Sequence, residues 1–158
     1  MSFAAGPPSR VLFLCTHNSA RSQMAEALLR RYGGDRFDAH GAGTEPASRI
    51  TPPTVVVMRQ LDLALVGQSP KDLDRYADQS WDYIITTRDA ANEACPAFPD
   101  DPTRIHWGFA DPSAVTGTEE ERLRAFRRIR DEIKRRVQLF VALPVHGLGA
   151  GQGVGGGA

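Results

Sequence analysis

The sequence has few cysteines: Cys15 and Cys95 are the only two among 158 residues. A small domain held together by disulfides needs several cysteine pairs, and a structural zinc site needs further cysteine or histidine ligands at short spacing. The low count argues against both classes and predicts no metal site. In the cytoplasm, where thiols stay reduced, each cysteine needs a separate explanation.

Net charge is also absent, because nineteen basic residues balance nineteen acidic ones. A neutral chain has no overall field that would attract nucleic acid or an anionic membrane surface. No apolar run approaches the roughly 18 residues of a transmembrane helix, and residues 1–10 lack the basic-then-apolar order of a secretory signal. We therefore expect a cytoplasmic protein with no nucleic-acid partner and no membrane contact.

Length and composition favour one folded domain. At 158 residues, with 41% hydrophobic and 24% charged residues, the chain has enough apolar material for a single core and enough charge for solubility. We expect an extended or disordered N-terminus over 1–9, the folded domain over 10–143, and a flexible glycine-rich tail over 144–158. We also expect a monomer.

Hydrophobic periodicity predicts strands that alternate with helices. Strands are predicted at 11–14, 37–42, 81–87 and 105–107, and helices at 22–32, 54–61, 71–77, 90–94 and 118–140. Thr118 and Glu121 form a capping box at the start of the last helix. This alternation predicts an α/β domain, a small parallel sheet flanked by helices on both faces. Ligands bind at the carboxyl ends of such strands, and Cys15 follows the first one.

The segment Cys-Thr-His-Asn-Ser-Ala-Arg, residues 15–21, connects a buried strand to a helix. Such a loop directs backbone amides to one point beside the positive end of the helix, which suits a tetrahedral oxyanion. The sequence has neither a Walker motif nor a dinucleotide-binding glycine motif here. The predicted anion-binding residues are Thr16, His17, Asn18, Ser19 and Ala20, together with Arg21, whose planar guanidinium can hold two anion oxygens.

Cys15 lies at the mouth of this loop. A thiolate is stabilised at a helix N-terminus and near a cation, so Cys15 is a candidate nucleophile. Ser22 is expected to donate a further hydrogen bond to the thiolate, and Asn18 is expected to brace the loop. A buried structural cysteine is the alternative, but the five intervening residues before Arg21 favour the nucleophile.

The Cys-x5-Arg-Ser pattern of residues 15–22 resembles the loop of the low-molecular-weight tyrosine phosphatase fold, and in particular its arsenate reductase branch. Further segments resemble that branch in the same order, and together they span residues 10–141: 22–27, 41–46, 94–96, 106–109, and Asp111-Pro112. The resemblance implies that 10–143 is a catalytic domain. It also implies that Asp111 is the general acid that protonates the leaving oxygen.

The resemblance implies reduction of arsenate to arsenite through a covalent adduct on Cys15, with no bound cofactor. A second thiol then attacks the Cys15 sulfur, and Cys95 is the internal candidate. Thioredoxin-coupled relatives carry another cysteine seven residues earlier, where this chain has Arg88, expected to be solvated. Either Cys95 attacks directly, or an external thiol from a thioredoxin, glutaredoxin, glutathione or mycothiol system does so.

Two other functions remain open. A phosphatase of the same fold would hydrolyse phosphate monoesters through a phosphorylated Cys15. Aromatic residues that would contact a phenyl ring are replaced by Ser113 and Ala114, which favours a small inorganic anion such as arsenate, phosphate or sulfate. A non-catalytic oxyanion sensor is disfavoured because it has no need of Asp111.

Some reductases of this branch resemble one another in binding potassium near the loop through asparagine, glutamate, serine and aspartate. Asn18 and Glu26 match this set, whereas Gly41 replaces the serine and Lys71 stands near the aspartate. We therefore expect the Lys71 ammonium to take the place of the cation.

Overall fold

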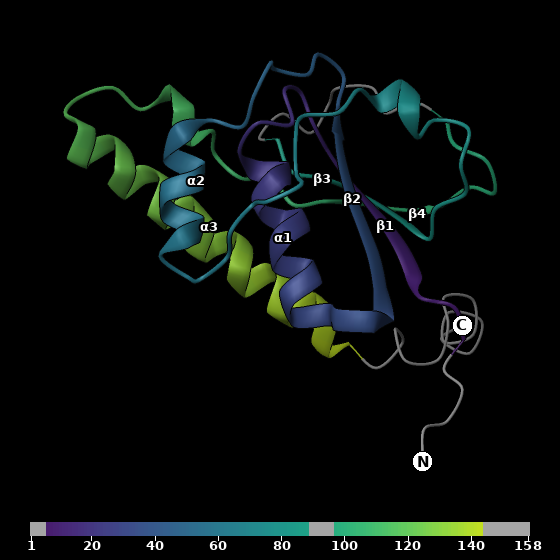
Figure 1. Cartoon of the computed structure of the whole chain (residues 1–158). Coiled ribbons are helices and arrows are strands. Elements are labelled where there is room, and N and C mark those ends of the chain that lie inside the picture. Colours follow the sequence, from purple (N-terminus) through teal and green to yellow (C-terminus); the bar gives the residue numbers. More distant parts are fainter. Residues whose placement is uncertain (1–5, 89–96, 144–158) are drawn as a thin grey trace.

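A computed structural model describes residues 6–88 and 97–143 (Figure 1). Four strands form one sheet: β1 (Ser9–Cys15), β2 (Phe37–Gly43), β3 (Tyr83–Thr86) and β4 (Thr103–His106). The strand order is β2-β1-β3-β4, and every neighbouring pair is parallel. The predicted single α/β domain with a small parallel sheet is therefore confirmed.

Three α-helices pack on one face of this sheet: α1 (Arg21–Gly33), α2 (Pro52–Arg59) and α3 (Glu119–Ala142). Short 3₁₀ helices follow or connect the main elements: η1 (Gly34–Arg36), η2 (Leu73–Arg75) and η3 (Pro112–Ala114). The core between sheet and helices contains Phe13 and Ile85 from the strands and Leu28 and Ile133 from the helices, all fully buried. This packing fixes α1 directly behind β1 and the loop that joins them.

Among the described residues, the second face of the sheet is covered by η2 and loops rather than by an α-helix. Leu12 and Ile84 pack there against Leu73, Tyr76 and Trp81. The predicted helix over 71–77 is thus reduced to η2. The predicted short helix over 90–94, the glycine-rich tail over 144–158 and most of the N-terminal extension lie outside the described residues.

Helix α3 begins as the sequence predicts. The Thr118 side chain accepts a hydrogen bond from the Glu121 amide, and Glu121 accepts one from the Thr118 amide, which completes a capping box. Hydrogen bonding of the Glu121 carboxylate with Thr118 lowers the pKa of Glu121. The predicted apolar stripe is buried at Phe126, Ile129 and Ile133 and continues to the end of the helix. The cap satisfies two amides that have no partner within the helix, and so it stabilises the first turn.

The last strand differs from the one predicted at 105–107. β4 begins at Thr103, earlier than predicted, and three of its four residues are exposed. The reason is its place at the edge of the sheet, where only β3 pairs with it. Directly after β4, Trp107 and Phe109 turn back into the core beside α3, and this turn brings the chain toward the end of β1.

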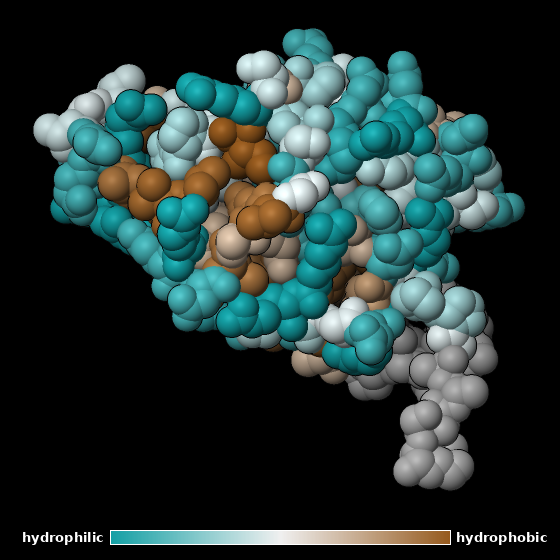
Figure 2. All heavy atoms as spheres, viewed as in Figure 1, coloured by the Kyte–Doolittle hydropathy of each residue, from teal (hydrophilic) through white to brown (hydrophobic). Residues whose placement is uncertain are grey.

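The surface carries both hydrophobic and hydrophilic side chains. Figure 2 shows hydrophobic side chains gathered over α2 and its surroundings, bordered by hydrophilic ones. Val56 on α2 and Val66 in the following segment are exposed there. Within residues 6–88 and 97–143, no helix combines the length and the apolar character that a membrane crossing needs.

Candidate active site

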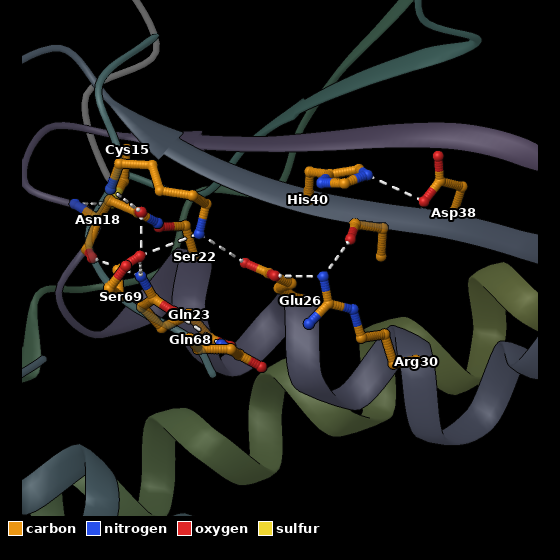
Figure 3. A network of polar contacts seen from close by, with 12 residues as sticks. Cys15, Asn18, Ser22, Gln23, Glu26, Arg30, Asp38, His40, Gln68 and Ser69 are labelled. Atoms are coloured by element: carbon orange, nitrogen blue, oxygen red, sulfur yellow. Dashed lines mark hydrogen bonds and ion pairs between the residues drawn. The ribbon is translucent and has the colours of Figure 1, made fainter. Parts of the chain in front are cut away.

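Cys15 is the last residue of β1 and is nearly inaccessible, with 3% of its surface exposed. Its Sγ lies 2.9 Å from the hydroxyl of Ser22 and accepts a hydrogen bond from the Asn18 amide at 3.1 Å. The Asn18 Nδ2 donates to that same Ser22 hydroxyl at 2.6 Å (Figure 3). With Asn18 Nδ2 donating to the Ser22 oxygen, the single proton of that hydroxyl is available to the sulfur. Cys15 Sγ therefore has the Asn18 amide and the Ser22 hydroxyl within hydrogen-bond distance.

The carbonyl oxygens of the loop between β1 and α1 accept hydrogen bonds from the segment that follows β2. Amides of that segment donate to the loop at 2.8 to 3.0 Å: Glu45 to Thr16, Ala47 to His17, and Thr51 to Ser19. The His17 ring also lies 2.9 Å from the Glu45 carbonyl and is therefore directed away from the loop centre. A role for the imidazole in holding an anion is not supported by this orientation.

These carbonyl contacts determine where the loop amides point. In a planar trans peptide the C=O and the following N–H point in opposite directions. With the carbonyls of Thr16, His17 and Ser19 directed outward, the amides of His17, Asn18 and Ala20 point inward, and the Asn18 amide indeed reaches Cys15. An inward set of amides at the N-terminus of α1 is the arrangement that binds tetrahedral oxyanions.

Gly43, at the end of β2, makes this close approach possible. A Cβ atom there would lie 2.5 Å from the Thr16 carbonyl oxygen and 3.0 Å from the Asn18 amide. Any side chain would therefore displace the loop. Sequence reasoning did not assign Gly43 a role, although a glycine inside a strand often marks a close backbone approach.

Arg21 and Asp111 come from distant parts of the chain and meet beside the loop. The Arg21 guanidinium is mostly buried; its Nη1 donates to the Phe109 carbonyl at 2.9 Å, and its Nη2 lies 3.9 Å from Asp111 Oδ2. Asp111 Oδ1 accepts from the Ser113 amide at 2.9 Å, which caps η3. The tertiary structure thus brings the expected acid to the expected anion site.

Of the two remaining residues of the predicted thiol chemistry, the structure describes Arg88 but not Cys95. Cys95 lies outside the described residues, so its distance from Cys15 is not defined. Arg88 follows β3 and is buried, with 5% of its surface exposed, so the expectation of a solvated arginine is wrong. It lies just past the carboxyl end of β3, where the polypeptide continues from the sheet toward the Cys95 segment.

Glu26 of α1 forms a buried charged cluster behind the loop. Its Oε2 lies 2.6 Å from Arg30 Nη2, and its Oε1 lies 3.6 Å from Lys71 Nζ, which donates to the Ser69 carbonyl at 2.9 Å. Burial raises the pKa of Glu26 although Lys71 and Arg30 oppose this, and burial lowers the pKa of Lys71 against the attraction of Glu26. Both shifts reflect the cost of removing charges from water.

This cluster does not fit a potassium ion. Gly41 offers no side-chain oxygen, and a Cβ there would already lie 2.9 Å from Glu26 Oε1 and 3.0 Å from Asn18 Nδ2. The ammonium of Lys71 supplies the positive charge that a cation would bring. In the part of the chain that the structure describes, no three His, Cys, Asp or Glu side chains are grouped as metal ligands.

Activity is therefore expected to be independent of potassium. Replacing potassium chloride with choline chloride at constant ionic strength should leave kcat/KM for the anion substrate unchanged, because Lys71 occupies the position beside Glu26. The measurement is a titration of initial rate against potassium concentration. A saturable activation by potassium, absent with choline, would contradict it.

Comparison with known proteins identifies the family. Residues 10–146 match the family model described as low molecular weight phosphotyrosine protein phosphatase. The chain belongs to this family. The match covers the anion loop, Asp111 and nearly all of the described sheet.

Within the low molecular weight phosphatase family, this chain is similar to proteins named arsenate reductase. The one from Halalkalibacterium halodurans is 41% identical over 130 residues, which are 82% of this chain and 93% of the relative. A solved arsenate reductase in the phosphate binding state superposes with a TM-score of 0.73 at 25% identity, covering 85% of this chain and 97% of that one. A thioredoxin-dependent arsenate reductase of Corynebacterium glutamicum has a TM-score of 0.59 at 28% identity, covering 87% of this chain and 65% of the other.

Proposed function

We propose that the chain reduces arsenate to arsenite through a covalent adduct on Cys15. The observation that carries this proposal is the hydrogen bonding of Cys15 Sγ with the Asn18 amide and the Ser22 hydroxyl, beside a loop that ends at the Arg21–Asp111 pair. The arsenate reductases to which the chain is similar support arsenate as the substrate. Phosphate and sulfate, which share its tetrahedral shape and charge, are expected to bind the same loop.

In the first step, arsenate lies in the loop with its oxygens on the inward amides and on Arg21. The Cys15 thiolate attacks arsenic, a sulfur–arsenic bond forms, and one arsenic–oxygen bond breaks. The departing group is a hydroxyl of arsenate, which takes a proton from Asp111 and leaves as water. Arsenic is still pentavalent at this point. This step needs the Asp111 carboxyl in its protonated form.

In the second step, another thiolate attacks the Cys15 sulfur. A disulfide forms, the sulfur–arsenic bond breaks, and its electron pair stays on arsenic, which leaves as arsenite. Two thiolates have then lost two electrons to arsenic, and an external reductant must reopen the disulfide. We propose Cys95 as the attacking thiol and a thioredoxin, glutaredoxin or low-molecular-weight thiol as the reductant, in the reducing environment of the cytoplasm.

Replacing Cys95 with serine tests the resolving thiol. We expect Cys95→Ser to lose most of its arsenate turnover with a thioredoxin system, because no internal thiolate can release arsenite. Aryl phosphate hydrolysis by the same variant should be unchanged, since hydrolysis needs no second thiol, and this serves as the folding control. Turnover should be assayed with thioredoxin, glutathione plus glutaredoxin, and mycothiol. Full arsenate turnover by Cys95→Ser would mean that an external thiol attacks Cys15 directly.

Phosphate monoester hydrolysis is the second candidate function. The first step is shared, because a thiolate in an oxyanion loop can attack phosphorus as well as arsenic, and water can then open the phosphocysteine. Ser113 and Ala114, which follow Asp111-Pro112, are exposed and offer no aromatic surface to a phenyl ring. We therefore propose weak aryl phosphatase activity beside the reductase. If arsenate is untouched with all three reductants while aryl phosphate turns over, the chain is a phosphatase.

A further inference from the structure

We propose that Gln23 is a positioning residue that sets the conformation of Asn18 and thereby the reactivity of Cys15. The inference deepens the proposed function, since it concerns the same nucleophile, but its test needs no arsenate. Gln23 lies in the first turn of α1 and is completely buried. A buried amide must find partners for its donors and acceptor, so the arrangement around it is tightly determined.

The carboxamide of Gln23 is directed at the anion loop. Its Nε2 lies 2.8 Å from the Asn18 carbonyl oxygen, 3.0 Å from Asn18 Oδ1 and 2.9 Å from the Ser69 carbonyl oxygen. Its Oε1 accepts from Gln68 Nε2 at 2.7 Å. Figure 3 shows this group beside Asn18, with Gln68 and Ser69 nearby. Two of the three acceptors thus belong to one loop residue.

Asn18 needs such support because its backbone is left-handed, with φ of 50°. This conformation is uncommon for a residue with a Cβ and persists only where surrounding contacts hold it. Gln23 holds the Asn18 carbonyl through its amide nitrogen. The amide of Ser19 shares that peptide and therefore points the opposite way, so the same contact also orients a predicted anion donor.

Gln23 also determines which way the Asn18 side chain faces. Asn18 Oδ1 accepts from Gln23 Nε2 and from the Lys71 amide at 2.9 Å. With the oxygen end committed to these two donors, the Nδ2 end turns to the Ser22 hydroxyl. Ser22 then has its proton free for Cys15. A chain of directed hydrogen bonds therefore runs from Gln23 through Asn18 and Ser22 to the sulfur.

The test is the alkylation of Cys15 by iodoacetamide, which reports the thiolate. In a Cys95→Ser background Cys15 is the only thiol. Gln23→Met keeps the length of the side chain and removes its hydrogen bonds. We expect its alkylation rate near pH 7 to fall about three- to tenfold, as the loss of one directed hydrogen bond would cause, and the midpoint of the rate against pH to move upward. Gln79→Met is the matched control, since Gln79 accepts from Arg10 and donates to the Arg75 carbonyl.

Circular dichroism establishes that the Gln23→Met protein is folded. If Gln23 had only a structural role, the folded variant would keep the midpoint of its alkylation rate against pH. An unchanged pH profile in folded Gln23→Met would overturn the proposal. If Gln23→Met does not fold, Gln23→Glu supplies the second test: it keeps the size, puts an oxygen against the Asn18 and Ser69 carbonyl oxygens, and is expected to slow alkylation in the same direction.

A double-mutant cycle tests the route through Asn18. Glycine adopts a positive φ freely and has no side chain, so Asn18→Gly removes the carboxamide that Gln23 orients and keeps the backbone carbonyl that Gln23 also contacts. In that background Gln23→Met should slow alkylation by a smaller factor than in the parent. Equal factors in both backgrounds would mean that Gln23 does not act through the Asn18 side chain. Because no arsenate is present, this outcome is independent of whether arsenate is the substrate.

Discussion

Cys15→Ser is expected to lower both arsenate reduction and aryl phosphate hydrolysis by about 10⁴-fold or more. A thiol ionises near neutral pH, whereas a serine hydroxyl needs a base to remove its proton. Among the described residues, the Asn18 amide donates a hydrogen bond to Cys15 Sγ, and the Ser22 hydroxyl lies within hydrogen-bond distance of it. Neither group is a base that would take the proton of a serine at this position. The site is therefore built for a thiolate.

The same variant should still bind phosphate and arsenate, because the inward amides and Arg21 are untouched by the substitution. Isothermal titration with phosphate measures this, and steady-state assays measure the loss of turnover. Cys95→Ser is the matched control, with one thiol removed elsewhere and phosphatase activity retained. Residual turnover of a few per cent in pure Cys15→Ser would indicate another nucleophile and contradict the assignment.

Asp111→Asn is expected to lower kcat by about 10²- to 10³-fold for substrates whose leaving oxygen must be protonated. Asparagine has nearly the same shape and can still accept from the Ser113 amide through its oxygen, so η3 should remain capped. It has no acidic proton to give. The loss therefore isolates proton donation from positioning, and KM should change much less than kcat.

Two aryl phosphates measure this directly. Hydrolysis of p-nitrophenyl phosphate, whose leaving group is stable as an anion, should suffer less from Asp111→Asn than hydrolysis of phenyl phosphate. Asp78→Asn, in an exposed turn, is the control and should leave both rates unchanged. Equal losses for the two substrates would show that Asp111 acts on binding or on Arg21 rather than as the acid.

Local patterns predicted much of this molecule, because they depend on neighbours in the chain. The apolar run before Cys15, the helical spacing after Arg21 and the capping box at Thr118 all appear where the sequence places them. The strand-loop-helix order was enough to expect an oxyanion loop with Cys15 at its mouth. The family resemblance rested on short motifs, and each of these motifs consists of a few consecutive residues.

The features that local patterns missed depend on residues far apart in the chain. Nothing near Gly43 indicates that its missing Cβ admits the Thr16 carbonyl, and nothing near Gln23 indicates that its carboxamide reaches Asn18. The burial of Arg88 and the exposure of β4 follow from the strand order, which periodicity does not encode. A short apolar run predicts a strand whether that strand becomes central or lies at an edge.

The sequence by itself determined the reacting groups: a cysteine, an arginine after five intervening residues, and an aspartate before a proline. Only the tertiary structure decided how these groups face one another. Asp111 meets Arg21 because β4 is parallel to β3 and delivers Phe109 and Asp111 to the edge where β1 ends at Cys15. The carboxyl ends of parallel strands meet at one edge, so residues distant in sequence converge there, and hydrogen bonds from buried side chains such as Gln23 then fix their directions.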